Sequence, residues 1–315
     1  MGEYNKLMIK KEGKKIYFYV NDDEVFKTKF EPIFGNYNGF SLNRRMVINV
    51  DYLEIRQDGM ELILVDNAIN GYVKENLGKN VNSSVADILP VISPDGNTLY
   101  YTRKLHPENT GADMHDDIWY STRDRDNNWG LTKNMGKPLN NSGYNSVISV
   151  SPDGNTLYLL HTYTQSGEAG PAGLSVSNRT EKGWEIPKTI EIKDYYNNNN
   201  YVEYCMSPNK KVLIMAIERD DTEGERDLYA SFEKKGKFTE PKNMGPALNS
   251  FGNEMSPFLA ADNKTLYFAS NGRHGYGGTD IYVSKRLDDS WTNRKKKKNL
   301  GPEINSSGWD AYYTI

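Results

Sequence analysis

The sequence has little cysteine, no long apolar run and none of the compact motifs that mark common hydrolases. Cys205 is the only cysteine in 315 residues, so no disulfide can form within the chain. No stretch of about 18 apolar residues occurs, which excludes a membrane-spanning helix. No G-x-S-x-G elbow is present, and the four histidines include no tight pair such as H-x-H or H-E-x-x-H. The sequence therefore predicts no metal site and no cofactor.

Charge and the first residues exclude further classes of protein. The formal net charge is −3, which gives no reason to expect nucleic acid or an anionic membrane surface as a partner. The start, MGEYNKLMIKKEGKK, has no apolar region of the kind found in signal peptides. Gly2 is no myristoylation site because Lys6 stands where serine or threonine is required. Cys205 lies in an apolar pattern, YVEYCMS, which predicts a buried, inert thiol and not a nucleophile.

The stretch SPDGNTLYY, from Ser93, returns three times along the chain. The copies start at Ser151, Ser207 and Ala260, with steps of 58, 56 and 53 residues. Proline presets the first turn angle, aspartate bonds its own downstream backbone, and glycine accepts a positive φ, so each copy predicts a hairpin turn. The residues that follow are β-branched or aromatic and predict a strand. A period of this length fits a unit of about four strands.

Other landmarks repeat in the same register. After each hairpin comes a second strand signal, at DIWYS, GLSVS, DLYAS and DIYVS, and then one aromatic residue: Trp129, Trp184, Phe238 and Trp291. Connectors such as NMGKPLNNS, from Asn134, and NLGPEINSS, from Asn299, lead into the next apolar strand. The third connector is replaced by an Asn-rich run, Asp194 to Asn200. One unit therefore contains an inner strand, a Ser-Pro turn, a second strand, a long loop, a third strand, an aromatic fourth strand and a connector.

The combination of SPDGNTLYY, DIWYS, a single tryptophan and NMGKPLNNSG resembles the Pro-Asp-motif, WD40-like repeats of TolB-like β-propellers in bacterial cell envelopes. It is especially similar to those found upstream of OmpA-type domains, and it covers roughly residues 76 to 315. The resemblance implies an all-β propeller and a non-catalytic binding or scaffolding role in the periplasm or at the outer membrane. An envelope protein or a cell-wall glycan is the partner that it implies.

The repeats divide the chain into three regions. Residues 86–315 are expected to form the propeller, with four full blades at about 86–140, 141–197, 198–249 and 250–305. Residues 309–315 match the inner strand of a fifth blade, so we expect an incomplete propeller with this strand paired on the flank of the fourth blade or loosely held. Residues 59–85 contain a bridging strand and the first connector.

Residues 1–58 form a different region of the sequence, outside the repeats. IYFYVNDDEVFKTKF predicts two strands across a polar turn, Asn21 to Glu24, and YNGFSLN and MVINVDYLEI predict two more. Residues 9–55 resemble the C-terminal half of a concanavalin-like or laminin-G-like jelly roll, which implies a partial β-sandwich.

The long loops between the second and third strands are the predicted binding surface, because they open on the same face of a propeller as the connectors. All four histidines lie in them. We name as candidate binding residues the histidines, arginines and aromatic residues of this loop face: Arg103, His106, His115, Tyr144, His161, Arg219, Arg273, His274, Tyr276 and Trp309. For each one, an ordinary solvated loop position is the competing interpretation.

A second set of residues is expected to serve structure. Asp95, Gly96, Asp153 and Gly154 shape the first two hairpin turns. Asp117, Asp227 and Asp280 head the third strands, where each could pin the preceding loop by accepting backbone N–H bonds. A ring of these acids around a cation is the alternative, and Gly173 in the second unit weakens it.

No catalytic residues are predicted. A propeller-fold glycoside hydrolase or lyase that uses loop carboxylates is the alternative function, although nothing in the sequence selects a pair of acids.

Overall fold

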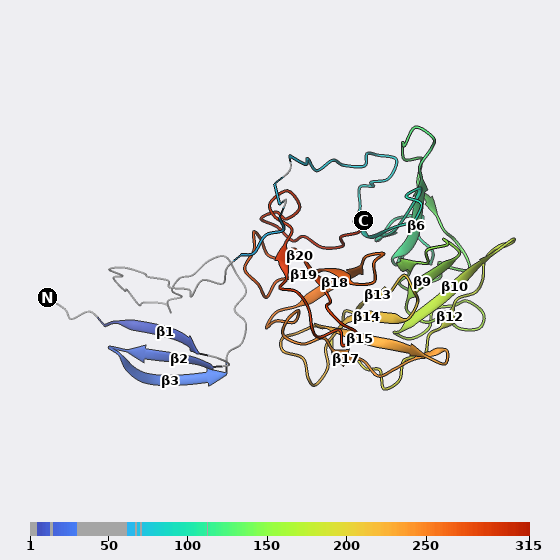
Figure 1. Cartoon of the computed structure of the whole chain (residues 1–315). Coiled ribbons are helices and arrows are strands. Elements are labelled where there is room, and N and C mark those ends of the chain that lie inside the picture. Colours follow the sequence, from blue (N-terminus) through green and yellow to red (C-terminus); the bar gives the residue numbers. More distant parts are fainter. Residues whose placement is uncertain (1–4, 13–14, 30–61, 67, 70, 112) are drawn as a thin grey trace. The chain divides into compact units, whose positions relative to one another are not determined.

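The computed structural model describes residues 5–12, 15–29, 62–66, 68–69, 71–111 and 113–315. The chain divides into two compact units, residues 1–55 and 56–315, and each is described by itself. The described residues form strands, turns and loops and contain no helix, so the predicted all-β class is confirmed. Figure 1 labels the strands in chain order.

The first unit contains a three-stranded antiparallel sheet. Its strands are β1 (Leu7–Glu12), β2 (Lys15–Val20) and β3 (Asp23–Lys29), in that order. Asn21 and Asp22 make the turn between β2 and β3 with φ of 53° and 72°, the left-handed geometry of a tight hairpin. The predicted strands YNGFSLN and MVINVDYLEI lie outside the described residues, so the partial β-sandwich stays a prediction.

The second unit contains four antiparallel sheets that follow one another along the chain. Sheet 1 consists of β4 (Asp87–Ile92), β5 (Thr98–Arg103), β6 (Asp117–Thr122) and β7 (Lys133–Asn134). Sheet 2 consists of β8 (Val147–Val150), β9 (Thr156–Leu160), β10 (Leu174–Thr180), β11 (Gly183–Trp184) and β12 (Lys188–Thr189). Sheet 3 consists of β13 (Glu203–Met206), β14 (Val212–Ile217), β15 (Asp227–Lys234), β16 (Lys237–Phe238) and β17 (Lys242–Asn243). Sheet 4 consists of β18 (Glu254–Leu259), β19 (Thr265–Ser270), β20 (Asp280–Lys285) and β21 (Lys298–Asn299).

In sheets 2 and 3 the predicted fourth strand is split into two short strands. In sheet 3, Phe238 of β16 pairs with Glu233 of β15, and the chain pairs with β15 again only at β17. Pro241 stands between the two pieces, and Pro187 stands at the same place in sheet 2. Proline has no N–H to donate to a ladder, which explains the interruption.

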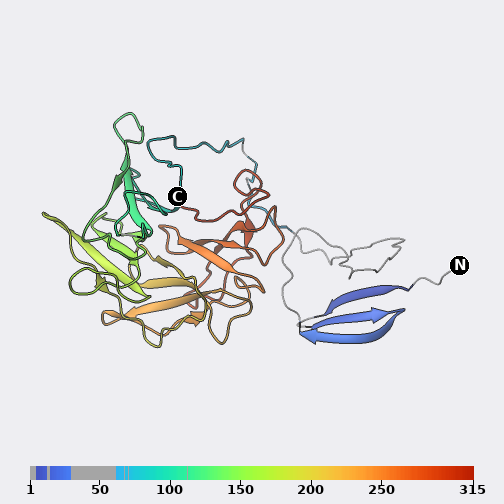
Figure 2. The same ribbon diagram turned by 180° about the vertical axis from the view of Figure 1, so that it is seen from behind.

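The first strands of the four sheets meet at the centre of this unit. β4 packs against β8, β8 against β13, and β13 against β18. Figures 1 and 2 show the sheets in chain order, from the teal of sheet 1 to the orange of sheet 4. Three of these first strands contain a register shift, at Ile88/Val91, Val147/Ser149 and Met255/Phe258. Such bulges bend a strand and redirect its side chains.

The apolar cores lie between the faces of neighbouring sheets. In β14, every residue from Val212 to Ile217 is buried, because this strand is covered on both faces. Ile214 packs in a cluster shared with sheet 4, whereas Leu213 packs in a cluster shared with sheet 2. Adjacent residues on one strand point to opposite faces, so a continuous apolar run fills two cores.

The Ser-Pro turns have the geometry that the repeat predicts. In the first turn, the Ser93 hydroxyl donates to Asp95 Oδ1 at 2.5 Å and the Asn97 N–H donates to the same oxygen at 3.0 Å. Gly96 has φ of 73° and Gly154, in the second turn, has φ of 71°. Lys210 occupies this place in the third turn with φ of 59°.

A side-chain clamp repeats at the end of sheets 1, 3 and 4. In sheet 1, Asp117 Oδ2 accepts the Thr110 N–H and the Asn134 side-chain amide, both at 2.7 Å. Asn140 then binds both backbone groups of Ile118, with its Oδ1 accepting the N–H and its Nδ2 donating to the carbonyl, each at 2.9 Å. Asp227, Asn243 and Asn249 repeat these contacts in sheet 3, and Asp280, Asn299 and Asn305 repeat them in sheet 4. The aspartates therefore fasten the preceding loops, and the second asparagine ties each connector to the third strand.

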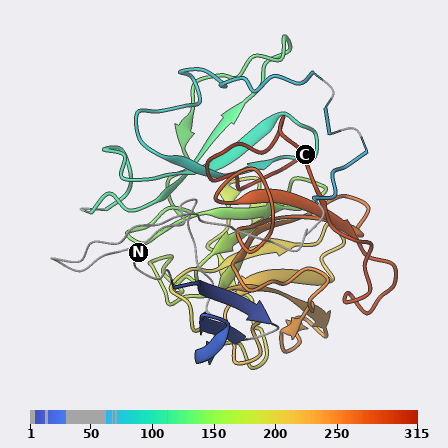
Figure 3. The ribbon, with the colours of Figure 1, turned by 90° about the vertical axis from the view of Figure 1, so that its left-hand side faces the viewer.

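Two further segments lie on the flank of sheet 4. Leu64 pairs with Asn299 through a parallel bridge, which is the only strand contact described within the predicted strand MELILV. The C-terminal segment pairs through a bridge between Trp309 and Thr279, and the Tyr313 ring lies 4.9 Å from the Tyr267 ring. In Figure 3 the red C-terminal end lies near the teal strands of sheet 1, and residues 310–315 form no regular strand.

Candidate functional site

The long loops and the connectors lie at the same end of the sheets. The loop after β5 contacts the following connector, since the Asn145 N–H donates to the Asp116 carbonyl at 2.6 Å. Equivalent backbone contacts join the loops of sheets 3 and 4 to their connectors, from Glu225 to Gly252 and from Gly278 to Gly308. We call this end the loop face, and it comprises the described residues of loops 104–111 and 113–116, 161–173, 218–226 and 271–279 with the adjoining connectors.

A pocket of about 230 Å³ opens between the connector that follows sheet 1 and the loop that follows β9. Tyr144 lies at this pocket with 53% of its surface exposed. The His115 ring lies 4.4 Å from the Tyr144 ring and the His161 ring lies 6.4 Å from it. Three of the predicted binding residues, contributed by three separate segments, are thus brought together.

His161 is held in an unusual backbone conformation. Its φ is 68°, a region that side chains other than glycine rarely adopt and that costs on the order of 1 kcal/mol or more. Burial lowers the pKa of its imidazole, so the ring is neutral at pH 7. Its ring nitrogens make no hydrogen bond to the described residues, which leaves one donor and one acceptor for a ligand.

The frame of the pocket depends on residues that the sequence did not single out. Asn145 Nδ2 donates to the carbonyls of Asn141 and Gly143, and the Tyr163 hydroxyl donates to Asn145 Oδ1 at 3.2 Å. A Cβ on Gly143 would lie 2.8 Å from the Cβ of Ala169, so glycine is required for this close approach. Asn145 stands at the same distance before its hairpin turn as Asp87 and Glu254 do in other repeats, and this shared register is the sequence signal that could have identified it.

The three predicted arginines are engaged inside the fold. Arg103 is 3% exposed and pairs with Asp87 Oδ1 at 2.7 Å, with its guanidinium 4.5 Å from the Trp119 ring. Arg219 is 8% exposed and donates to the Asp194 carbonyl at 3.0 Å. The Arg273 guanidinium donates to the carbonyls of Leu248 and Asn249. These guanidinium groups hold loops in place through contacts within the fold.

The remaining candidates are spread over the loop face. His106 packs edge-on against Trp119 at 4.9 Å, and His274 is exposed, with its carbonyl accepting the Tyr282 hydroxyl. Tyr276 is 37% exposed and Trp309 is 74% exposed. Trp309 follows the connector sequence N-S-S-G, as Tyr144 follows N-N-S-G, so two repeats present an exposed aromatic ring at the same position.

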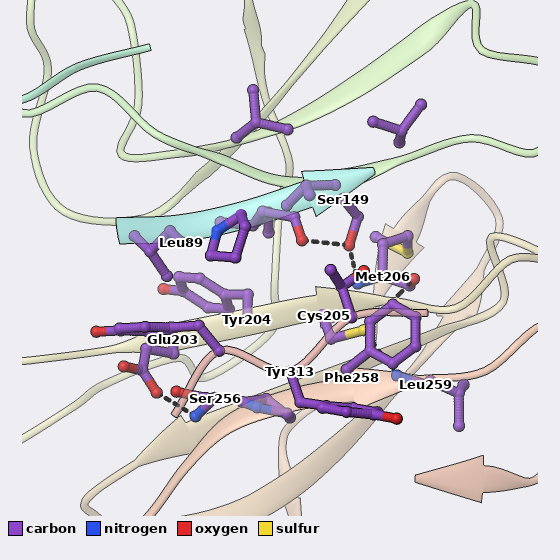
Figure 4. A pocket seen from close by; sticks show the side chains of 18 of the residues that line it. Leu89, Ser149, Glu203, Tyr204, Cys205, Met206, Ser256, Phe258, Leu259 and Tyr313 are labelled. Atoms are coloured by element: carbon purple, nitrogen blue, oxygen red, sulfur yellow. Dashed lines mark hydrogen bonds between the residues drawn. The ribbon is translucent and has the colours of Figure 1, made fainter. Parts of the chain in front are cut away.

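A second pocket, of about 120 Å³, lies where the first strands meet. Its walls are formed by β4, β8, β13 and β18 together with residues 312–314. Figure 4 shows Glu203 and Ser256 side by side at one end, with the rings of Tyr204, Phe258 and Tyr313 nearby. Cys205 also lines this pocket. Burial raises the pKa of its thiol to about 11, in agreement with the predicted inert cysteine.

Several buried acids carry shifted pKa values. Burial raises the pKa of Glu254 to about 7 and that of Asp227 to about 6. Both carboxylates accept hydrogen bonds, Glu254 from Ser250 in the preceding connector and Asp227 from Asn243 in β17. Burial also raises the pKa of Asp116, whose backbone carbonyl accepts the Asn145 N–H. Among the residues that the structure describes, no three histidine, cysteine or acidic side chains gather closely enough to hold a metal ion.

Comparison with known proteins yields structural matches only. No family model matches the chain, and no curated protein matches it in sequence. TolB from Acinetobacter baumannii is 15% identical with a TM-score of 0.42, over 65% of this chain and 42% of that protein. A putative TolB from Agrobacterium tumefaciens is 12% identical with a TM-score of 0.38, over 72% and 86%. An α-L-arabinofuranosidase from Lactobacillus brevis is 12% identical with a TM-score of 0.40, over 67% and 72%.

The alignment thus spans less than half of the Acinetobacter protein's own length. In the described part of the chain, no helix has both the length and the apolar character that crossing a bilayer requires.

Proposed function

We propose that this chain is a non-catalytic, propeller-type binding module of a bacterial envelope protein, located in the periplasm or at the outer membrane. The repeats that resemble Pro-Asp-motif propellers support this proposal, as do the four successive antiparallel sheets whose first strands meet at a common centre. The partner, an envelope protein or a cell-wall glycan, binds at the loop face.

The loop-face pocket is the observation that carries the proposal. An exposed tyrosine lies between two imidazoles, over a pocket of about 230 Å³ whose frame is held by the Asn145 hydrogen bonds. Aromatic side chains on a rigid frame bury much area at a low cost in conformational entropy, which is typical of binding hot spots. The neutral His161 ring adds a donor and an acceptor for a polar group of the partner.

The test compares two kinds of partner on one set of variants. Soluble peptidoglycan fragments and a detergent extract of envelope proteins are each offered to the immobilised chain, and bound material is quantified. Tyr144→Ala should reduce binding of the true partner by about tenfold or more, as loss of a central aromatic anchor does. Phe26→Ala, which removes a ring of similar exposure (58%) from the first unit, is the matched control. Equal binding by the wild type and Tyr144→Ala would contradict the proposal.

A glycosidase or lyase remains the alternative, and the raised pKa of Asp116 beside His115 is the observation that favours it. A raised pKa lets a carboxyl group hold its proton to a higher pH, which a general acid requires. Turnover of a panel of aryl glycosides or uronic-acid polymers that Asp116→Asn abolishes would replace the binding module by an enzyme. We expect only background rates of turnover for the wild type and for Asp116→Asn.

A further inference from the structure

The central pocket between the first strands contains a polar end that the fold leaves unsatisfied. Ser256 is 8% exposed, and its Oγ has no hydrogen-bond partner among the described residues. The Ser256 N–H donates to the Glu203 carboxylate, so both side chains lie at the same end of the pocket (Figure 4). An unpaired buried hydroxyl carries a desolvation penalty, and a ligand that pairs with it recovers this penalty.

Backbone strain is concentrated at the same pocket. Leu89 and Ser256 have φ of 53° and 50°, and each precedes a proline, Pro90 and Pro257, in a bulge of its first strand. A residue before proline is restricted to extended conformations, so a positive φ there is doubly unfavourable. All four residues line the pocket. Two sheets thus have the same backbone strain at one pocket, and such strain is typical of functional sites.

The rest of the wall is mostly apolar. Val91, Val150, Val202, Phe258 and Tyr313 line it, and its volume of about 120 Å³ approaches that of engineered apolar cavities, which bind molecules as large as benzene. The ligand must therefore be small, with an apolar body.

The charges at the polar end select the ligand's other group. Glu203 supplies a hydrogen-bond acceptor, and Arg226 Nη1 lies 3.9 Å from its Oε2, so the carboxylate is already paired with a cation. The neighbouring Tyr312 hydroxyl stays protonated, because burial and the Glu203 carboxylate raise its pKa to about 12. A neutral hydroxyl can donate to Glu203 or Ser256 and accept from Ser256 without adding a charge.

We propose that the central pocket is a binding site for a small aromatic or aliphatic alcohol, whose hydroxyl pairs with Ser256 and Glu203 and whose apolar body contacts the first strands. This site is separate from the loop face, so it stands whether or not the proposed partner binds there.

Phenol and benzene are the probes, with dissociation constants measured by ligand-observed NMR on the full chain. Phenol should bind about 3- to 10-fold more tightly than benzene, the effect of one additional hydrogen bond. Ser256→Ala should remove this preference, and Ser84→Ala, at an exposed position, should preserve it. Val91→Phe should fill the pocket and abolish binding of both probes, whereas the same change at exposed Val73 should have no effect.

Val150→Phe fills the pocket from β8 and serves as a second blocking variant if Val91→Phe does not fold. Failure of the wild type to bind either probe would overturn the proposal and leave ordered water as the occupant. Equal affinities for phenol and benzene would overturn the role of the Ser256 hydroxyl, and undiminished binding by a folded filling variant would overturn the location.

Discussion

At the scale of single residues, positive φ angles identify where side chain and backbone conflict. The first two Ser-Pro turns place Gly96 and Gly154 at φ of 73° and 71°, and the third places Lys210 at 59°. Glycine adopts this region freely, whereas a residue with a Cβ pays roughly 1–2 kcal/mol. The three turns thus form an internal series that differs at the critical position.

We predict that Lys210→Gly leaves the free energy of unfolding unchanged or raises it by up to about 1 kcal/mol, because the substitution removes the steric conflict. Gly96→Val and Gly154→Val should each destabilise by about 1 kcal/mol or more, since a β-branched residue resists positive φ. Urea denaturation followed by circular dichroism measures all three. A loss of stability in Lys210→Gly would mean that its contact with Thr156, at 3.5 Å, matters more than the turn.

His161 makes the stability of the fold depend on pH. Its pKa is lowered from an ordinary value of 6.5 by burial, so the unfolded chain binds a proton more readily than the folded chain. Stability should therefore fall as pH drops below about 6.5, until the folded imidazole is also protonated. His161→Asn removes the titration and keeps a residue that tolerates positive φ. Between pH 7 and pH 5 the melting temperature of the wild type should fall by more than that of His161→Asn; a parallel pH profile would show that His161 is not the titrating group.

At the scale of elements, each connector has its own local fold, and its contribution to stability depends on whether its asparagine binds a neighbouring strand. Asn140, Asn249 and Asn305 each bind the N–H and carbonyl of one third-strand residue and are at most 3% exposed. The first connector has the same local fold, with the Gly78 N–H bonded to Asn76 and the Asn82 N–H bonded to the Gly78 carbonyl. Asn82 is nevertheless exposed.

We predict that Asn140→Ala, Asn249→Ala and Asn305→Ala each cost about 1–3 kcal/mol, because each leaves a buried peptide group without its partners. Asn82→Ala is the matched control and should change stability by less than about 0.5 kcal/mol, as at other exposed positions. Thermal unfolding of the four variants provides the comparison. A cost at Asn82 as large as the others would show that this connector clamps a strand too.

At the scale of the whole second unit, the cores between sheets couple each sheet to its neighbours. Leu213 and Ile214 are adjacent in β14 and fully buried, yet they face sheets 2 and 4 respectively. Truncation of either residue leaves a cavity on one side of sheet 3 only.

We predict that Leu213→Ala and Ile214→Ala each destabilise by about 2–5 kcal/mol, the range for buried aliphatic residues. Amide hydrogen exchange should separate the two variants: Leu213→Ala should speed exchange in β8 to β10, and Ile214→Ala should speed it in β18 to β20. Equal effects on both neighbours would mean that the unit opens only as a whole.

The sequence alone predicts the features that depend on contacts between nearby residues or on the repeated motifs. The Ser-Pro turns, the third-strand aspartates and the connectors follow from contacts within about twenty residues, and the four sheets follow from their period. Tertiary structure decided which polar side chains stay available. Arg103, Arg219 and Arg273 looked like loop residues and proved to be internal, because their partners lie on strands or connectors of the same or a neighbouring repeat.

Both pockets depend on the same kind of distant contact. Tyr144, His115 and His161 meet because one loop, one connector and the next loop converge at the end of adjacent sheets. Glu203 and Ser256 meet because two first strands, about fifty residues apart in the chain, face a common centre. Local pattern fixes neither the distance nor the burial of such pairs, since both are set by how the sheets pack.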